Sequence, residues 1–174
     1  MSGYSTEGVL VNWDEKRDMA LLKITVPEGM KLQPLRFSKA DAARGAKVAA
    51  FGFPMSDTVG STLKLTTGII SALADDSTEG MCVLDCRVNP GNSGGPLCDT
   101  RGHVVGMVTA KSGGGYGVDS YGMALPAATL RPFLLKHLPD TAKGIIAPDK
   151  GDAMEWEEVD RLVGPSVLMI VRKR

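Results

Sequence analysis

Short runs of hydrophobic residues, separated by polar and turn-forming residues, recur along most of the chain. Each run has the length of a β-strand and is bounded by Gly, Pro, Asn, Asp or Ser. Asp14 to Arg17 forms a polar turn between the first two runs, and Gly68 in the fourth predicts a bulge or a close backbone approach. The expected strands are residues 9–13, 19–25, 47–53, 63–73, 81–86, 103–110 and 121–125.

One stretch has helical rather than strand periodicity. Residues Pro126 to Leu138 begin with proline and place leucine or phenylalanine at 130, 133, 134 and 138, which predicts an amphipathic helix. Pro139 and Gly144 end that helix. A short helical turn, ended by Gly45, is also expected at Ser38 to Arg44.

Short strands closed by one helix fit two packed β-barrels. The sequence therefore predicts a mainly β fold with a complete second barrel from about Leu63 to Leu125, capped by the helix. A partial first barrel is expected ahead of it. With 174 residues, 43% hydrophobic content and 21 glycines, the chain is long enough for one turn-rich domain with its own core.

Charge and composition exclude several classes of function. Twenty basic and 20 acidic residues give a formal net charge of zero, so the overall charge does not favour a nucleic acid partner. No apolar run reaches the ~18 residues of a membrane span, and residues 1–7 lack the pattern of a signal peptide. The motifs HExxH, Walker A and GxGxxG are absent, so neither a metal nor a cofactor is expected.

The three cysteines, Cys82, Cys86 and Cys98, form no CxxC pair. On one face of a strand, Cys82 and Cys86 would lie about 13 Å apart at ~3.3 Å per residue, which is too far for a disulfide. Buried free thiols are therefore expected. They do not indicate whether the protein works in a reducing or an oxidising compartment.

The most informative segment is Asn89 to Leu97, with the sequence NPGNSGGPL. Ser93 lies in a turn that lifts its hydroxyl off the backbone, and Gly91 and Gly94 leave a substrate carbonyl unobstructed. Successive N–H groups in such a turn can point into one concavity and form an oxyanion hole. Taken alone, the pattern GxSG also occurs in ordinary turns between strands.

The longer string GNSGGPL resembles the nucleophile loop of the chymotrypsin-fold, or trypsin-like, serine proteases, and NPGNSGGPL is most similar to their HtrA/Deg branch. Further segments match that family in the right order, and they are DMALLKI at 18–24, AFGFP at 50–54, TGIISAL at 67–73 and GMALP at 122–126. The resemblance covers roughly Val9 to Leu138. It implies a chymotrypsin-like double β-barrel with a C-terminal helix.

Residue by residue, the resemblance implies Ser93 as nucleophile, Gly91 and Ser93 as oxyanion N–H donors, and Asp18 as the carboxylate that orients a histidine. The family's histidine precedes that aspartate, yet none of the seventeen residues before Asp18 is histidine. His103 corresponds to the hairpin turn after the serine loop and His137 to the end of the last helix, and neither position carries the base in the family. Asp18 can alternatively be a solvated turn residue.

The resemblance also places a substrate pocket. Its floor is Arg87, six residues before the nucleophile, and its wall is Thr109, Ala110 and Lys111. HtrA-like proteases usually have a small apolar residue at the floor. A basic floor would disfavour Lys or Arg next to the scissile bond and favour an acidic side chain. Alternatively, Arg87 extends into solvent or pairs with Asp85.

The expected organisation is an N-terminally incomplete protease domain over 1–140, a linker over 141–153 and a helix–strand tail over 154–174. The tail is similar to the segment that opens this family's domains, but it also fits an ordinary amphipathic tail. On the first interpretation it starts a second protease unit or folds back as a permuted first strand. An incomplete first barrel would leave an exposed sheet edge, which favours self-association.

Two classes of function follow from this sequence. The first is a serine endopeptidase acting on protein or peptide substrates, inactive as this chain alone unless another segment or chain supplies the histidine. The second is a non-catalytic binding or scaffold protein that keeps the protease surface. Members of the family usually work in the cell envelope or outside the cytoplasm, whereas the compartment of this chain is left open.

Overall fold

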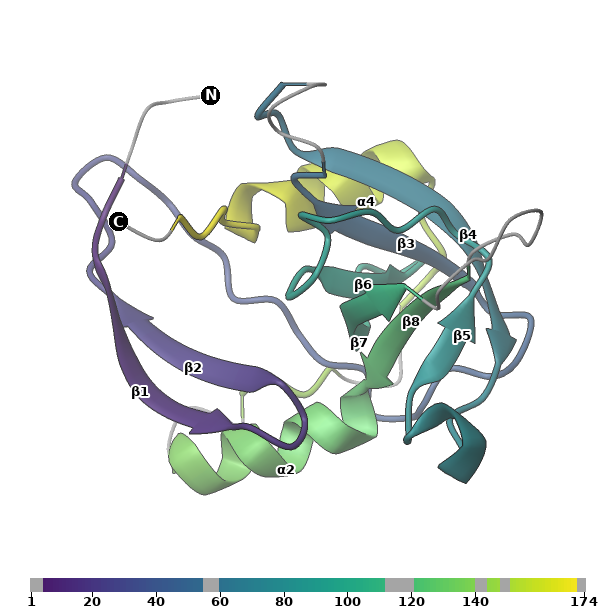
Figure 1. Ribbon diagram of the computed structural model, residues 1–174. Coiled ribbons are helices and arrows are strands. Elements are labelled where there is room, and N and C mark those ends of the chain that lie inside the picture. The colour runs from purple at the N-terminus through teal and green to yellow at the C-terminus, as the bar shows by residue number, and fades with distance from the viewer. Residues whose placement is uncertain (1–4, 55–59, 112–120, 140–143, 148–150, 172–174) are drawn as a thin grey trace.

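A six-stranded antiparallel barrel forms the main body of the molecule (Figure 1). The computed structural model describes residues 5–54, 60–111, 121–139, 144–147 and 151–171. The barrel runs β3-β4-β5-β8-β7-β6 and closes through the pair β6–β3. Its strands are β3 (Lys47–Gly52), β4 (Lys64–Ala72), β5 (Cys82–Leu84), β6 (Pro96–Asp99), β7 (Val104–Lys111) and β8 (Gly122–Pro126).

A separate two-stranded sheet precedes the barrel in sequence. It consists of β1 (Gly8–Asp14) and β2 (Met19–Ile24), which pair antiparallel with a register shift between Leu10 and Asn12. Met19 anchors this hairpin because its side chain is buried against Leu125 and Leu130. The mainly β fold, with one complete barrel and one partial sheet, is therefore confirmed.

The predicted start of the barrel near Leu63 is wrong, because β3 belongs to the barrel. Ala49 pairs with Thr67 of β4 on one side and with Cys98 of β6 on the other. Every residue of β3 after Lys47 is buried. A strand that has partners on both edges and packing on both faces is a central strand of this barrel.

Two hydrophobic clusters lie on opposite faces of β3, because successive side chains of a strand alternate in direction. Val48 and Ala50 point to the barrel interior, where they join Ile70, Leu84, Leu97 and Val108. Ala49 and Phe51 point outward and pack against the helix α4 (Trp156–Val163). Val159 and Val163 of α4 are fully buried there.

The predicted helix at residues 126–138 is present as α2 (Ala127–His137), whereas the expected helical turn at Ser38 to Arg44 is not formed. Instead, Phe37 forms isolated parallel β-bridges with Val104 and with Ile146. Ser38 donates its N–H to the carbonyl oxygen of Val104 at 2.9 Å. The main chain is thus held in an extended form over β7, which competes with helix formation. Two short 3₁₀ turns, η1 (Asp76–Thr78) and η2 (Gly164–Ser166), also occur in the described part of the chain.

The C-terminal segment folds back onto the barrel. Leu162 contacts the turn at Gly102, and the Ser166 hydroxyl donates to the carbonyl oxygen of Gln33 at 2.5 Å and accepts the Gln33 N–H at 3.0 Å. The helix expected there is present, but residues 167–171 pair with no strand of the described chain. Among the described residues, no helix is long and apolar enough to cross a bilayer.

Local expectations for Gly68 and the cysteines are confirmed. A Cβ atom on Gly68 would overlap the carboxylate of Asp85, so the backbone approaches closely at this position. Cys82, Cys86 and Cys98 are buried free thiols.

Candidate active site

Ser93 lies in the loop between β5 and β6, and two glycines shape this loop. Gly91 has φ +104° and Gly94 has φ +81°, a region that L-residues rarely adopt. A Cβ atom on Gly91 would overlap the carbonyl oxygen of Phe53, whose own N–H donates to the Gly91 carbonyl at 3.0 Å. The loop is therefore pressed against the end of β3, and Ser93 is left exposed.

The main-chain N–H groups around Asn92 differ in how they are used by the described part of the chain. Asn92 donates to the carbonyl of Asn89 at 3.0 Å, and Gly95 donates to the carbonyl of Asn92 at 2.9 Å. Within the described ranges, the N–H groups of Gly91 and Ser93 donate to no other residue. These two free donors are the pair that the resemblance assigned to an oxyanion hole.

The Ser93 hydroxyl has a main-chain partner. Its Oγ donates a hydrogen bond to the carbonyl oxygen of Thr109, on β7, at 3.1 Å. A peptide carbonyl accepts the hydrogen bond but does not remove the proton from Oγ, because a neutral amide oxygen is a very weak base. The bond orients the hydroxyl without activating it.

A cavity of about 670 Å³ lies beside the serine loop, with Gly91 and Ser93 in its wall. Most of the wall is apolar, and it comes from β3, β7, α2 and the C-terminal segment. The principal apolar contributors are Leu35, Phe37, Phe53, Met107, Leu130 and the segment 167–171. No titratable side chain occurs in the described lining of this cavity.

Asp18 is in the turn between β1 and β2. It adopts a left-handed conformation with φ +50°, and its N–H donates to the Glu15 carbonyl at 3.4 Å. Its side chain is exposed, and in the part of the chain that the structure describes the carboxylate forms no hydrogen bond or ion pair. Asp18 does not line the cavity beside Ser93. Its contact with a catalytic histidine stays a prediction.

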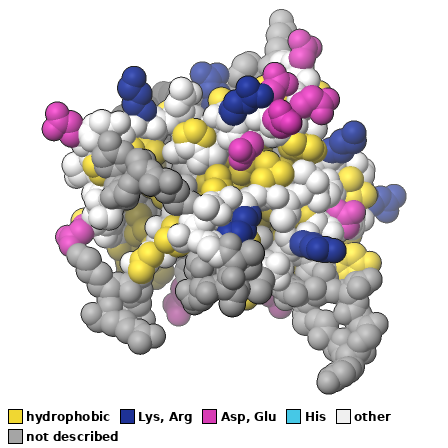
Figure 2. Space-filling view, turned by 90° about the horizontal axis from the view of Figure 1, so that it is seen from above, with side chains coloured by type: hydrophobic (Ala, Val, Ile, Leu, Met, Phe, Trp, Pro, Cys, Tyr) yellow, Lys and Arg dark blue, Asp and Glu magenta, His cyan; other side chains and the backbone are white. Residues whose placement is uncertain are grey.

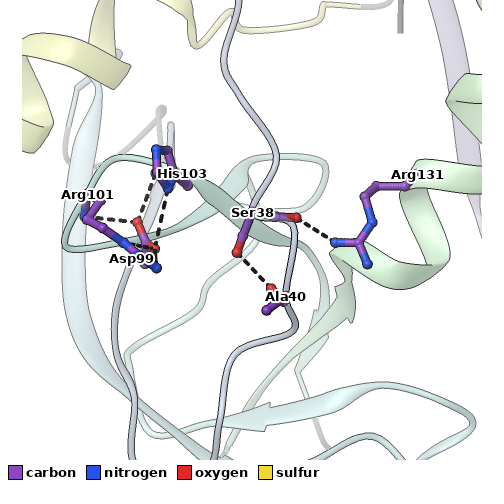
Figure 3. Close-up of polar contacts among 6 residues, drawn as sticks. All are labelled: Ser38, Ala40, Asp99, Arg101, His103 and Arg131. Atoms are coloured by element: carbon purple, nitrogen blue, oxygen red, sulfur yellow. Dashed lines mark hydrogen bonds and ion pairs between the residues drawn. The ribbon is translucent and has the colours of Figure 1, made fainter. Parts of the chain in front are cut away.

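Neither histidine lines this cavity. Figure 3 shows the His103 ring turned toward Asp99 in the β6–β7 turn, and Nδ1 lies 3.8 Å from the Asp99 carboxylate. His137 is in the last turn of α2, where its ring lies 4.8 Å from that of Phe133, centroid to centroid. Both imidazoles therefore have local partners away from the serine loop.

The predicted substrate pocket is only partly described. Arg87 is exposed and, among the described residues, its guanidinium forms no ion pair; Asp85 instead accepts the Ile69 N–H at 2.6 Å. Of the expected wall, Thr109 holds the Ser93 hydroxyl, and the side chains of Ala110 and Lys111 lie outside the described residues. Arg87 and Thr109 are not part of the cavity lining.

Two features of the site were missed from the sequence. Asn92 is 2% exposed, and its Oδ1 is buried without a hydrogen-bond partner in the described chain. Its position directly before Ser93 in NPGNSGGPL could have marked it as a candidate site residue. The second feature is the segment 167–171, which lines the cavity beside Ser93. Its distance from Ser93 in the sequence gave no signal of this contact.

Comparisons with known proteins agree with this arrangement. The trypsin-like peptidase domain family matches residues 2–107. The chain is 36% identical over 133 residues to Protease Do-like 1, chloroplastic, of Arabidopsis thaliana, covering 70% of this chain and 28% of that protein. It is 33% identical over 177 residues to the probable periplasmic serine endoprotease DegP-like of Ectopseudomonas mendocina, covering 95% of this chain and 36% of that protein.

A further relative and a solved structure extend the agreement. The serine protease Do-like HtrB of Bacillus subtilis is 35% identical over 142 residues, covering 76% of this chain and 30% of that protein. The crystal structure of the serine endoprotease from Yersinia pestis superposes with a TM-score of 0.61 and 30% identity, covering 78% of this chain and 45% of that chain. The chain spans about a third of the length of these curated relatives. It belongs to the trypsin-like peptidase family, in the HtrA/Deg branch.

Proposed function

We propose that this chain carries the serine-bearing part of a serine endopeptidase site, for protein or peptide substrates, and does not hydrolyse peptide bonds by itself. One observation carries the proposal: the Ser93 hydroxyl is bonded to the Thr109 carbonyl, next to a cavity without titratable lining in the described chain. A serine needs a base to remove its proton as it attacks. Because the triad acts as a unit, a missing base lowers kcat by roughly 10³-fold or more.

Asp18 is proposed as the orienting carboxylate once a histidine is supplied by another segment or chain. An imidazole bonded to both groups at ~2.6–3.2 Å requires about 6–8 Å between the Asp18 carboxylate and the Ser93 hydroxyl. A separation above about 12 Å in a complex that contains the histidine would leave Asp18 as a turn residue only. Arg87, Thr109, Ala110 and Lys111 remain the proposed substrate pocket.

A fluorophosphonate probe tests the proposal directly, because it labels only a serine that a base activates. We expect no labelling of the 174-residue chain, and labelling when a histidine-bearing segment is added. The Ser93→Ala variant shows whether any signal comes from Ser93. Strong Ser93 labelling of the unmodified chain would refute the inactivity, and its loss in His103→Ala or His137→Ala would identify the base.

The alternative is a non-catalytic binding protein that keeps the protease surface. Two observations favour it: among the described residues the N–H groups of Gly91 and Ser93 have no acceptor, and the adjoining cavity is mostly apolar. A bound peptide could use both features, and binding needs no base. A chain that binds peptides and never labels, even with the histidine supplied, would support this alternative over the peptidase.

Self-association through the partial first barrel is also proposed. Val9, Leu10 and Trp13 of β1 are 66%, 52% and 62% exposed, so large apolar side chains gather at the surface of this one strand. Figure 2 shows hydrophobic side chains reaching the surface between charged ones on one face of the molecule. Sedimentation velocity of the Trp13→Lys variant, compared with a Lys16→Glu control in the exposed turn, should show a shift toward monomer only for the first.

A further inference from the structure

The hairpin of β1 and β2 leaves both faces of its first strand uncovered. Val9 and Leu10 point to opposite faces, because successive side chains of a strand alternate in direction, and both are more than half exposed. Among the described residues β1 pairs with β2 alone, so its second edge meets no strand. A two-stranded hairpin is marginally stable by itself, and a third strand with an apolar face is a usual means of stabilising it.

The segment 167–171 has the properties of a strand but no partner strand. Its sequence is Val-Leu-Met-Ile-Val, and it begins in an extended conformation, with φ −90° and ψ +117° at Val167. Val and Ile favour strands, and Ile170 and Val171 are mostly exposed. The segment pairs with no strand of the described chain.

Different parts of the fold hold the segment and the hairpin. The segment follows Ser166, which is fixed by its two hydrogen bonds to Gln33, and it lies along the wall of the cavity beside Ser93. No residue of β1 or β2 occurs in the described lining of that cavity. The hairpin is anchored through Met19 to the region of α2, as Figure 1 shows. Each of the two apolar surfaces is therefore available to a second molecule.

The charges around the two surfaces are complementary. Glu7 precedes β1 and Asp14 ends it, so an acidic residue stands at each end of the strand. Three basic residues, 172–174, follow the segment in the sequence. Whichever way the segment runs along β1, its basic end comes beside an acidic residue. Neither residues 8–13 nor residues 167–171 contain the charge or proline that usually protects an edge strand from pairing.

We infer that the segment 167–171 of one molecule adds as a third strand to β1 of a second molecule, and that two molecules exchange these segments reciprocally. The inference rests on the proposed self-association and names the contact that produces it. Strand addition of this kind is held by main-chain hydrogen bonds and by alternate apolar side chains. Because each molecule gives one segment and receives one, the pair closes as a two-fold dimer and does not grow into a filament.

The test uses two full-length variants, each of which damages one half of the contact. Trp13→Lys places a charge on β1, and Ile170→Glu places one on the segment. Both positions are mostly exposed in the single chain, so neither substitution should disturb folding. In sedimentation velocity the unmodified chain should be a dimer. Each variant alone should shift toward monomer, with the dissociation constant raised roughly 10-fold or more.

Mixing the two variants gives the decisive result. The intact segment of the Trp13→Lys chain can pair with the intact β1 of the Ile170→Glu chain, so an equimolar mixture should recover dimers. Leu73→Lys is the matched control, because it replaces another exposed apolar side chain, directly after β4 of the barrel, and it should leave the dimer unchanged.

Three results would overturn the inference. A stable dimer of Ile170→Glu alone would show that β1 associates without the segment, and the proposed self-association would stand. Variants that stay monomeric when mixed would exclude the exchange. A monomeric unmodified chain would refute both the exchange and the self-association. Since none of these results depends on probe labelling of Ser93, the proposed peptidase role is tested separately.

Discussion

A Cβ atom placed on Gly102 would lie 2.7 Å from Cδ2 of Leu162. The turn between β6 and β7 therefore meets helix α4 at a position where a Cβ atom would displace the Leu162 side chain. Gly102 also has φ +73°, so two independent restrictions apply at one residue. This contact connects the barrel to the C-terminal segment that lines the cavity beside Ser93.

Replacement of Gly102 should loosen α4. Gly102→Ala combines left-handed backbone strain, which costs about 1–3 kcal/mol, with displacement of the Leu162 side chain, which is 41% exposed. Gly60→Ala is the matched control, because Gly60 has φ +84° and open space around a Cβ atom. Urea denaturation should show a larger loss of the free energy of unfolding for Gly102→Ala, partly recovered by adding Leu162→Ala. Equal losses in both glycine variants would contradict the contact.

Val159 should contribute strongly to stability. It is fully buried against Ala49 and Phe51, and Val159→Ala removes two methyl groups from that cluster, at a cost of about 2 kcal/mol. Val171→Ala, at a position that is 72% exposed, should change the free energy of unfolding by less than about 0.5 kcal/mol. Equal effects of the two substitutions would show that α4 is not held on the barrel.

Asp99 should hold the β6–β7 turn together. Its Oδ1 accepts the N–H groups of Arg101 and His103, both at 2.9 Å, and its Oδ2 accepts the Arg101 guanidinium at 3.0 and 3.1 Å (Figure 3). Asp99→Ala leaves these donors without partners and should lower the free energy of unfolding by about 2–3 kcal/mol. Asp99→Asn keeps an oxygen acceptor for the main-chain N–H groups and should lower the free energy of unfolding by about half as much. Urea denaturation of the two variants and the unmodified chain measures both losses.

Alkaline pH should destabilise the fold through its buried thiols. Burial first, and then the negative charge of Asp85, raise the pKa of the Cys86 thiol to about 11. The folded chain therefore keeps a proton that the unfolded chain releases near the ordinary thiol value of 9.0. Stability from this group is complete below pH 9 and is lost as the pH rises toward 11, on the order of 2 kcal/mol in total.

The measurement is the free energy of unfolding between pH 8 and 11, for the unmodified chain and for Cys86→Ala. The variant should show a shallower decline of the free energy of unfolding over this range. A decline of the same slope in both proteins would exclude Cys86 as the cause.

The native chain should also react slowly with a thiol reagent at pH 8, because burial raises the pKa of Cys82 and Cys98 as well.

Most strands could be predicted because each is a short apolar run between turn residues, and the runs at Val104 and Gly122 are examples. The membership of β3 in the barrel could not be predicted in this way. A run such as Val48 to Phe51, buried on both faces, has the same sequence pattern in either barrel. β6, from Pro96 to Asp99, was missed because its four residues directly follow the serine loop and begin with proline.

The candidate site was partly predictable for a different reason. The loop around Ser93 is local, so its turn residues determine its shape, as the positive φ angles of Gly91 and Gly94 illustrate. The role of the Gly91 and Ser93 N–H groups as oxyanion donors stays a prediction. The cavity depends on residues far apart in the sequence. Residues 167–171 reach its wall through the packing of Val159 and Val163 on the barrel, which no local pattern encodes.

The hydrogen bond between Ser166 and Gln33 joins positions 133 apart in the sequence, so the C-terminal segment covers parts of the barrel that are synthesised long before it. This order matters during biosynthesis. The outer face of β3, at Phe51, is covered by Val159, which is translated about a hundred residues later. At ~5–20 residues per second, a ribosome needs roughly 5 to 20 s to supply the covering helix. During that interval the outer face of β3 is uncovered and apolar, first in the nascent chain and then, once β8 has been translated, in the closed barrel. A surface of this kind is what chaperones bind.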